Sequence, residues 1–168
     1  MADRGQFEYD VFISYSHKDE EWVSKTLLPM LEAAGLKVCI DFRDFEVGRR
    51  SIYNMQDATS RSRRTMLVIT EDWLSSEWTG LESVLAYQNV SAGEGRIIPV
   101  LLKPCKLPKE FAFIDAITRV DFTRPDREQY EWIKLFRAFD TEPPEMPAQR
   151  PPSHEERIAN QGEANQAV

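Results

Sequence analysis

The sequence predicts a doubly wound α/β domain, in which helices cover both faces of a five-stranded parallel sheet. Short, nearly continuous apolar segments alternate along the chain with segments whose apolar residues recur every three or four positions. The first pattern is typical of buried strands and the second of amphipathic helices. Because strands that alternate with helices form parallel sheets, we expect the flavodoxin-like strand order 2-1-3-4-5.

The expected strands are rich in β-branched and aromatic residues, which suit a sheet that is buried on both faces. They cover residues 9–15, 36–41, 65–70, 97–102 and 117–121. Pro99 lies inside the fourth segment and cannot donate a hydrogen bond to a neighbouring strand. It therefore predicts either an edge strand or a locally irregular pairing.

Helices are expected between these strands. The clearest begins near Trp22 and ends at Gly35, a residue suited to a left-handed C-cap. Further helices are expected over residues 51–62, 77–90 and 126–139, and residues 42–50 read as a charged loop.

Composition limits the class of protein. The 168 residues, 42% of them hydrophobic, fit one domain with a tail. A formal net charge of -7 argues against a dedicated nucleic-acid-binding protein. No segment reaches the roughly 18 apolar residues of a membrane span, and no signal-peptide core follows Met1, so we expect a cytoplasmic protein that does not bind membranes. Cys39 and Cys105 form no CxxC pair, and neither a zinc site nor a disulfide is implied.

A short N-terminal segment and a longer C-terminal segment flank the expected domain of residues 8–140. Residues 1–7 are expected to form a flexible terminus. The segment 141–168 contains five of the ten prolines and no aromatic residue, which predicts a disordered tail or linker.

Five arginines form the only local concentration of basic residues in the sequence. They are Arg49, Arg50, Arg61, Arg63 and Arg64. We interpret them as solvated charges near helix ends, with contact to an anion or a partner as the alternative.

Three polar turns should meet at the carboxyl edge of the sheet, where open α/β sheets bind ligands. They are residues 14–18, 42–50 and 75–82. In the third, Trp78 and Glu82 are four positions apart and lie about 40° from each other around a helix. They can face one small molecule, although packing of Trp78 on the sheet and solvation of Glu82 would explain them equally well.

Three sequence segments resemble the Toll/interleukin-1 receptor (TIR) domain family over residues 8–139. Residues 9–16 (YDVFISYS) resemble its first signature box, and residues 43–48 (RDFEVG) resemble the second, in the so-called BB loop from Phe42 to Arg50. Residues 76–82 (SEWTGLE) are similar to a stretch of enzymatic TIR domains in which a Trp precedes the catalytic Glu by four positions. In this respect the chain most resembles the bacterial NAD-cleaving TIR domains. The third box is matched only loosely, by residues 131–136 (EWIKLF).

The resemblance implies cleavage of the nicotinamide–ribose bond of NAD, giving nicotinamide and ADP-ribose or a cyclic isomer. It assigns catalysis to Glu82 and substrate contacts to His17, Lys18, Glu46 and Trp78, with NAD as substrate and no cofactor or metal. A carboxylate can stabilise the oxocarbenium-like sugar, and nicotinamide leaves without a general acid because it is already cationic in NAD. Solvated or turn-capping roles remain alternatives for His17, Lys18 and Glu46.

The same resemblance implies self-association through the BB loop and a role in immune or defence signalling, including antiviral defence. The alternative is a non-catalytic scaffold that signals by homotypic TIR–TIR docking, in which Glu82 is only a surface charge. Other chemistries fit less well. Residues 93–96 lack the Lys-Ser/Thr ending of a phosphate-binding loop, and Asp10 stands at the wrong end of its strand for a phospho-acceptor.

Overall fold

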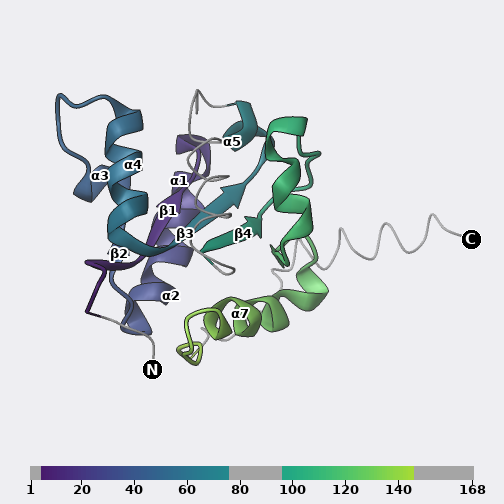
Figure 1. The fold of residues 1–168 in the computed structure, drawn as a ribbon. Helices are drawn as coiled ribbons and strands as arrows, with labels where there is room; N and C mark the ends of the chain where they lie inside the picture. Colours follow the sequence, from purple (N-terminus) through teal and green to yellow (C-terminus); the bar gives the residue numbers. More distant parts are fainter. Residues whose placement is uncertain (1–4, 76–95, 146–168) are drawn as a thin grey trace, which may run out of the picture.

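A parallel five-stranded sheet forms the centre of the molecule, with the predicted order β2-β1-β3-β4-β5 (Figure 1). The computed structural model describes residues 5–75 and 96–145. Its strands are β1 (Tyr9–Ser14), β2 (Val38–Cys39), β3 (Ser62–Ile69), β4 (Ile97–Leu101) and β5 (Val120–Asp121). The fold class is therefore confirmed, although β2 and β5 are only two residues long.

Pro99 lies in a strand that has neighbours on both sides, so the edge-strand interpretation is wrong. β4 pairs with β3 through Leu67 and Pro99, and with β5 through Val100 and Val120. β5 begins opposite Val100, so Pro99 has no residue of β5 to pair with. The register of β4 against β3 is continuous through Pro99, so the alternative, a locally irregular pairing, is not seen with that neighbour either.

The first helical region follows the predicted pattern with one irregularity. It consists of η1 (His17–Asp19), α1 (Glu20–Trp22), η2 (Val23–Leu27) and α2 (Leu28–Ala33). The η2 segment is a π-helical turn, and Pro29 follows it in the first turn of α2. Because proline lacks an N–H, the widened turn lies where the regular hydrogen-bond ladder is interrupted. Gly35 ends the region with φ +81, as expected of a left-handed C-cap.

The remaining helices are mostly short. They are α3 (Asp41–Asp44), α4 (Ser51–Arg61), α5 (Glu71–Ser75), η3 (Lys109–Ala116), η4 (Pro125–Arg127) and α7 (Glu128–Arg137). The expected loop 42–50 thus starts inside a helical turn, α3. The helix predicted over residues 77–90 lies entirely outside the described residues, as do residues 1–4 and 146–168, so this helix and the domain boundaries stay predictions. Within the described ranges, no helix has the length and apolarity needed to cross a membrane.

Two hydrophobic cores lie on opposite faces of the sheet. One joins α2 and α7 to the sheet and contains Leu31, Trp132 and Phe136. The other joins α4, α5 and η3 to it and contains Met55 and Trp73. Helices therefore cover both faces, as predicted. Trp132 and Phe136, from the loosely matched third box, are buried and belong to the core.

The basic residues differ from the helix-end interpretation. Arg63 and Arg64 lie in β3, because this strand begins at Ser62, opposite Tyr9 of β1. Arg61 does end α4, where its guanidinium pairs with Glu8. The pairing of β3 with β1 therefore determines where Arg63 and Arg64 lie, although their charges had suggested a solvated helix end.

Candidate functional site at the carboxyl edge of the sheet

The end of β1 and the segment after β2 meet at the carboxyl edge of the sheet. The Tyr15 hydroxyl donates a hydrogen bond to Asp41 Oδ1 at 2.7 Å. His17 Nε2 lies 3.8 Å from the other oxygen of Asp41, and the His17 side chain is 80% exposed. Burial, followed by this hydrogen bond to Asp41, raises the pKa of Tyr15. The neutral Tyr15 phenol therefore donates to Asp41 and holds this carboxylate next to the exposed imidazole of His17.

Lys18 connects the end of β1 to the segment after β3. Its ammonium nitrogen lies 3.2 Å from Asp72 Oδ1 in α5, and its side chain is 77% exposed. The Ser16 hydroxyl accepts a hydrogen bond from the Lys18 backbone N–H at 3.3 Å and caps η1. The turn is thus capped by Ser16, while the Lys18 side chain is presented to solvent at the rim.

A group of three residues centred on the buried Asp19 carboxylate lies beneath this rim, and we call it the Asp19 network. The Thr70 hydroxyl donates to Asp19 Oδ2 at 2.7 Å, and Lys103 Nζ lies 2.8 Å from Asp19 Oδ1. The Asp19 side chain is 1% exposed. Thr70 Oγ1 also accepts from the Trp73 backbone N–H, and the Trp73 indole donates to Ser14. The network therefore joins the ends of β1, β3 and β4.

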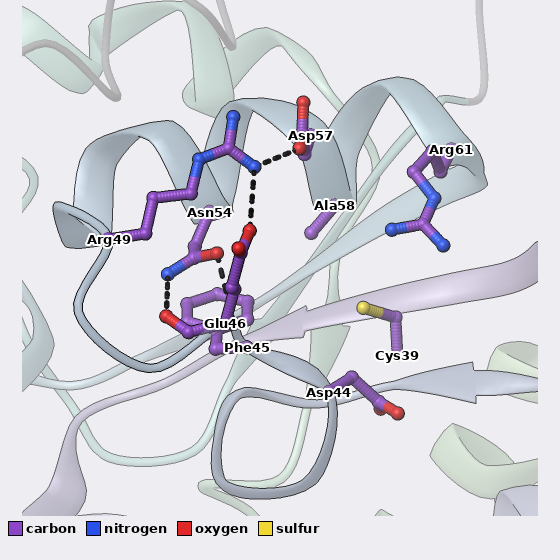
Figure 2. A pocket seen from close by; sticks show the side chains of 9 residues that line it. All are labelled: Cys39, Asp44, Phe45, Glu46, Arg49, Asn54, Asp57, Ala58 and Arg61. Carbon is purple, nitrogen blue, oxygen red and sulfur yellow. Dashed lines mark hydrogen bonds and ion pairs between the residues drawn. The ribbon is translucent and has the colours of Figure 1, made fainter.

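The 42–50 loop is held against α4 by the amide side chain of Asn54 and by an ion pair of Arg49. Asn54 Oδ1 accepts from the Glu46 N–H at 3.2 Å, and Asn54 Nδ2 donates to the Glu46 carbonyl at 3.1 Å (Figure 2). Arg49 pairs with Asp57 of α4 and lies 3.7 Å from the Glu46 carboxylate. At the loop tip, Val47 is 99% exposed and Gly48 has φ +84, a conformation that favours glycine.

A small cavity of about 90 Å³ lies between this loop and α4. Figure 2 shows the Cys39 thiol directed toward this space from β2. Burial, with a further contribution from the Asp44 carboxylate, raises the pKa of Cys39 to about 12. Cys39 is therefore an unreactive thiol while the loop stays closed.

The structure groups the predicted site residues in part. His17 and Lys18 lie together at the rim, as expected. Glu46 instead contacts Asn54 and Arg49, and its described contacts include neither His17 nor Lys18. Trp78 and Glu82 lie outside the described residues, so their roles stay predictions.

Sequence reasoning missed the residues that build the rim. Asp19, Thr70 and Lys103 each follow a strand at its carboxyl end, and this position was the available signal. Asp41 and Asp72 carried the same signal, because they follow β2 and β3. Among the described residues, no group of three or more His, Cys, Asp or Glu side chains is arranged to hold a metal ion.

Comparisons with known proteins place this geometry in a family. A family model described as TIR domain matches residues 11–136. The chain is 33% identical to human Toll-like receptor 1 over 128 residues, which are 76% of this chain and 16% of the receptor. It therefore spans only a small part of that relative.

Solved structures agree. The TIR domain of the Toll-related receptor TRR-2 from Hydra magnipapillata superposes with a TM-score of 0.67 at 33% identity, covering 79% of this chain and 98% of that one. A metazoan TIR-STING receptor from C. gigas, in complex with 2′,3′-cGAMP, gives a TM-score of 0.64 at 26% identity, covering 85% and 43%. These relatives are animal receptors and do not support the expected bacterial NAD-cleaving subtype. With the sheet order, the rim and the family match in agreement, the chain belongs to the TIR domain family.

Proposed function

We propose that this TIR domain signals by homotypic self-association through the 42–50 loop and that assembled copies cleave NAD. Homotypic association is general in the family, and a role in innate immune signal transduction agrees with the Toll-like receptor relatives. What remains to be tested is the surface that associates and the chemistry that follows.

The exposed apolar residues around the loop carry the first part of the proposal. Of the four exposed large hydrophobic residues among the described ranges, Phe42 and Val47 belong to the loop and Tyr53 to the adjacent α4. Asn54 holds the loop base while Val47 projects from the tip. Clustered apolar side chains on an ordered surface favour burial against another protein.

Sedimentation velocity tests this surface. A Val47→Asp variant places a charge at the tip without touching the Asn54 contacts, and we expect it to stay monomeric at concentrations where the wild type associates. Tyr130→Asp is the matched control, because Tyr130 is 70% exposed on α7, away from the loop. Equal loss of association in both variants would refute a loop-specific surface.

The carboxyl edge supports the second part of the proposal. His17 and Lys18 stand exposed at the edge where open α/β sheets bind ligands, and both can contact a phosphate or ribose. The resemblance assigns the catalytic carboxylate to Glu82 and the adjacent aromatic wall to Trp78. A carboxylate at this edge would stabilise the oxocarbenium-like sugar as the nicotinamide–ribose bond breaks, and water or an adenine nitrogen would then complete the reaction.

In the alternative, the protein is a scaffold that self-associates but does not cleave NAD. Its similarity to animal receptors is the observation that favours this alternative. Two variants separate the functions. Glu82→Ala should abolish nicotinamide release and leave self-association intact. Gly48→Pro cannot adopt φ +84 and should remove both. If Glu82→Ala leaves the cellular effect intact while Gly48→Pro removes it, the protein is a scaffold.

A further inference from the structure

A large concave surface lies at the opposite, amino edge of the sheet. It is a groove of about 830 Å³ between the starts of β4 and β5 and the second half of α7. We call it the amino-edge groove. Its size falls within the range of small-molecule sites. Neither the rim residues nor the 42–50 loop line it.

The walls of the amino-edge groove carry one sign of charge. Its cationic lining residues are Arg64, Arg119, Lys134 and Arg137, and no carboxylate of the described residues lines it. This concentration contrasts with the net charge of -7 of the whole chain. Lys134 and Arg137 are three positions apart on α7 and therefore share one helix face.

Three carboxylates outside the groove lining, Asp115, Glu131 and Asp140, partly balance these cations. Asp140 attracts Arg64 electrostatically. Arg119 NH1 lies 3.8 Å from Asp115, beyond hydrogen-bond distance. Lys134 Nζ lies 3.2 Å from Glu131 Oε2, which also accepts from the Asp121 backbone N–H. Glu131 is thus also bound to the last residue of β5, and the groove lining keeps an excess of positive charge.

The floor of the amino-edge groove is apolar. Ile97 and Ile98 line it from β4, Ile117 and Val120 line it from β5 and the residues before it, and Ala138 lines it from the end of α7. Arg64 joins the floor to the charged wall, with its guanidinium carbon 5.9 Å from the centre of the Phe139 ring. Burial, followed by repulsion from Arg63, lowers the pKa of Arg64, so an anion nearby would stabilise its charged form.

We propose that the amino-edge groove binds a soluble phosphate ester of about mononucleotide size. Lys134, Arg137 and Arg119 hold the phosphate through charge-assisted hydrogen bonds, and the isoleucine floor holds the apolar part of the ligand. This arrangement accounts for both the single sign of charge and the apolar floor, which inorganic phosphate alone would not use. The site is separate from the carboxyl edge and does not depend on NAD cleavage.

Isothermal titration calorimetry with adenosine 5′-monophosphate tests the proposal. Adenosine and inorganic phosphate are the two partial ligands, and each should bind at least about tenfold more weakly than the ester. A Lys134→Gln/Arg137→Gln variant should lose at least about tenfold in affinity for the ester, because charged hydrogen-bond partners are removed. Arg127→Gln is the matched control, since Arg127 is an exposed cation of η4 that does not line the groove. Thermal melting of each variant verifies folding, and Arg119→Gln provides a second groove variant on a different element.

Several outcomes would overturn the proposal. They are no binding of the ester at millimolar concentration, equal affinity for inorganic phosphate, and unchanged affinity in both groove variants. If a His17→Ala/Lys18→Ala variant alone abolishes binding, the ester occupies the carboxyl edge instead. Capture of the protein by phosphatidate vesicles that the ester does not displace would indicate a lipid headgroup as ligand. Nicotinamide release by the groove variants separates this result from the proposed function, because we expect that activity to persist in them.

Discussion

The carboxyl edge and the 42–50 loop are held in place by contrasting means. At the carboxyl edge, the Asp19 network joins residues up to 84 positions apart through a buried carboxylate. The loop is held by Asn54, only eight positions from Glu46, and by exposed ion pairs of Arg49. A buried charge is costly to separate from its partners, whereas part-buried hydrogen bonds between an amide and a loop backbone can be exchanged for water. We therefore expect the carboxyl edge to stay rigid and the neighbouring 42–50 loop to be able to open.

The largest effect is expected from Asp19→Ala. This change leaves the Thr70 hydroxyl and the Lys103 ammonium without their buried acceptor. Because Lys103 is 57% exposed and can turn toward water, we expect a loss of about 2–3 kcal/mol in the free energy of unfolding, less than for a fully buried pair. Urea denaturation measures it.

Asp72→Ala is the matched control for that experiment. It removes the acid paired with Lys18, whose side chain is 77% exposed, and should cost at most about 1 kcal/mol. Equal losses for the two variants would show that the Asp19 network does not hold the rim more firmly than a surface pair does.

A smaller effect is expected from Asn54→Ala. It removes both hydrogen bonds to the Glu46 backbone and should cost about 1–2 kcal/mol. Gln56→Ala is the control, because Gln56 is exposed on the same helix. If the two substitutions destabilise the protein equally, Asn54 is not what holds the loop.

Thiol labelling sharpens this test, because Cys39 lies in the cavity below the loop. In a Cys105→Ser background, the Cys39 thiol should be almost unreactive at pH 8, since its pKa of about 12 leaves it protonated. Asn54→Ala should raise the labelling rate about fivefold or more by opening the loop. Labelling that accelerates only in denaturant would mean that the loop does not open locally.

The smallest effect concerns pH. The hydrogen bond from Lys103 to Asp19, followed by their Coulombic attraction, raises the pKa of Lys103 above its ordinary value of 10.5. The stabilisation is therefore fully present below pH 10.5 and is lost as the pH rises through the raised value. Because Lys103 is partly exposed, the change should stay below about 1 kcal/mol. Comparing urea unfolding of the wild type and Lys103→Met from pH 8 to 11 measures it, and a difference independent of pH would contradict the assignment.

Periodicity predicted the framework of the fold better than its details. The alternation of apolar segments gave the sheet order, and Gly35 marked a helix end, because both signals are local. The expected strand 36–41 shrank to β2, since Asp44 accepts the Ile40 N–H and turns the chain into α3. Arg64 was misplaced because its pairing opposite Val11 is a tertiary effect.

The candidate site shows the same division. Its location followed from the rule for carboxyl ends of strands, and the substrate contacts that the family resemblance assigns to His17 and Lys18 stay predictions. The contact between Asp19 and Lys103 depends on how β1 and β4 are placed across the sheet, which no sequence spacing encodes. The substrate contact assigned to Glu46 stays a prediction, and its carboxylate lies 3.7 Å from Arg49 of its own loop.

The central claim is that copies docked through the 42–50 loop cleave NAD at the carboxyl edge. Nicotinamide release per protein molecule, measured across protein concentrations, tests it most directly. We expect this rate to rise with concentration in the wild type, to stay low in Val47→Asp and to be absent in Glu82→Ala. No release from the wild type at concentrations where sedimentation shows association would contradict the claim.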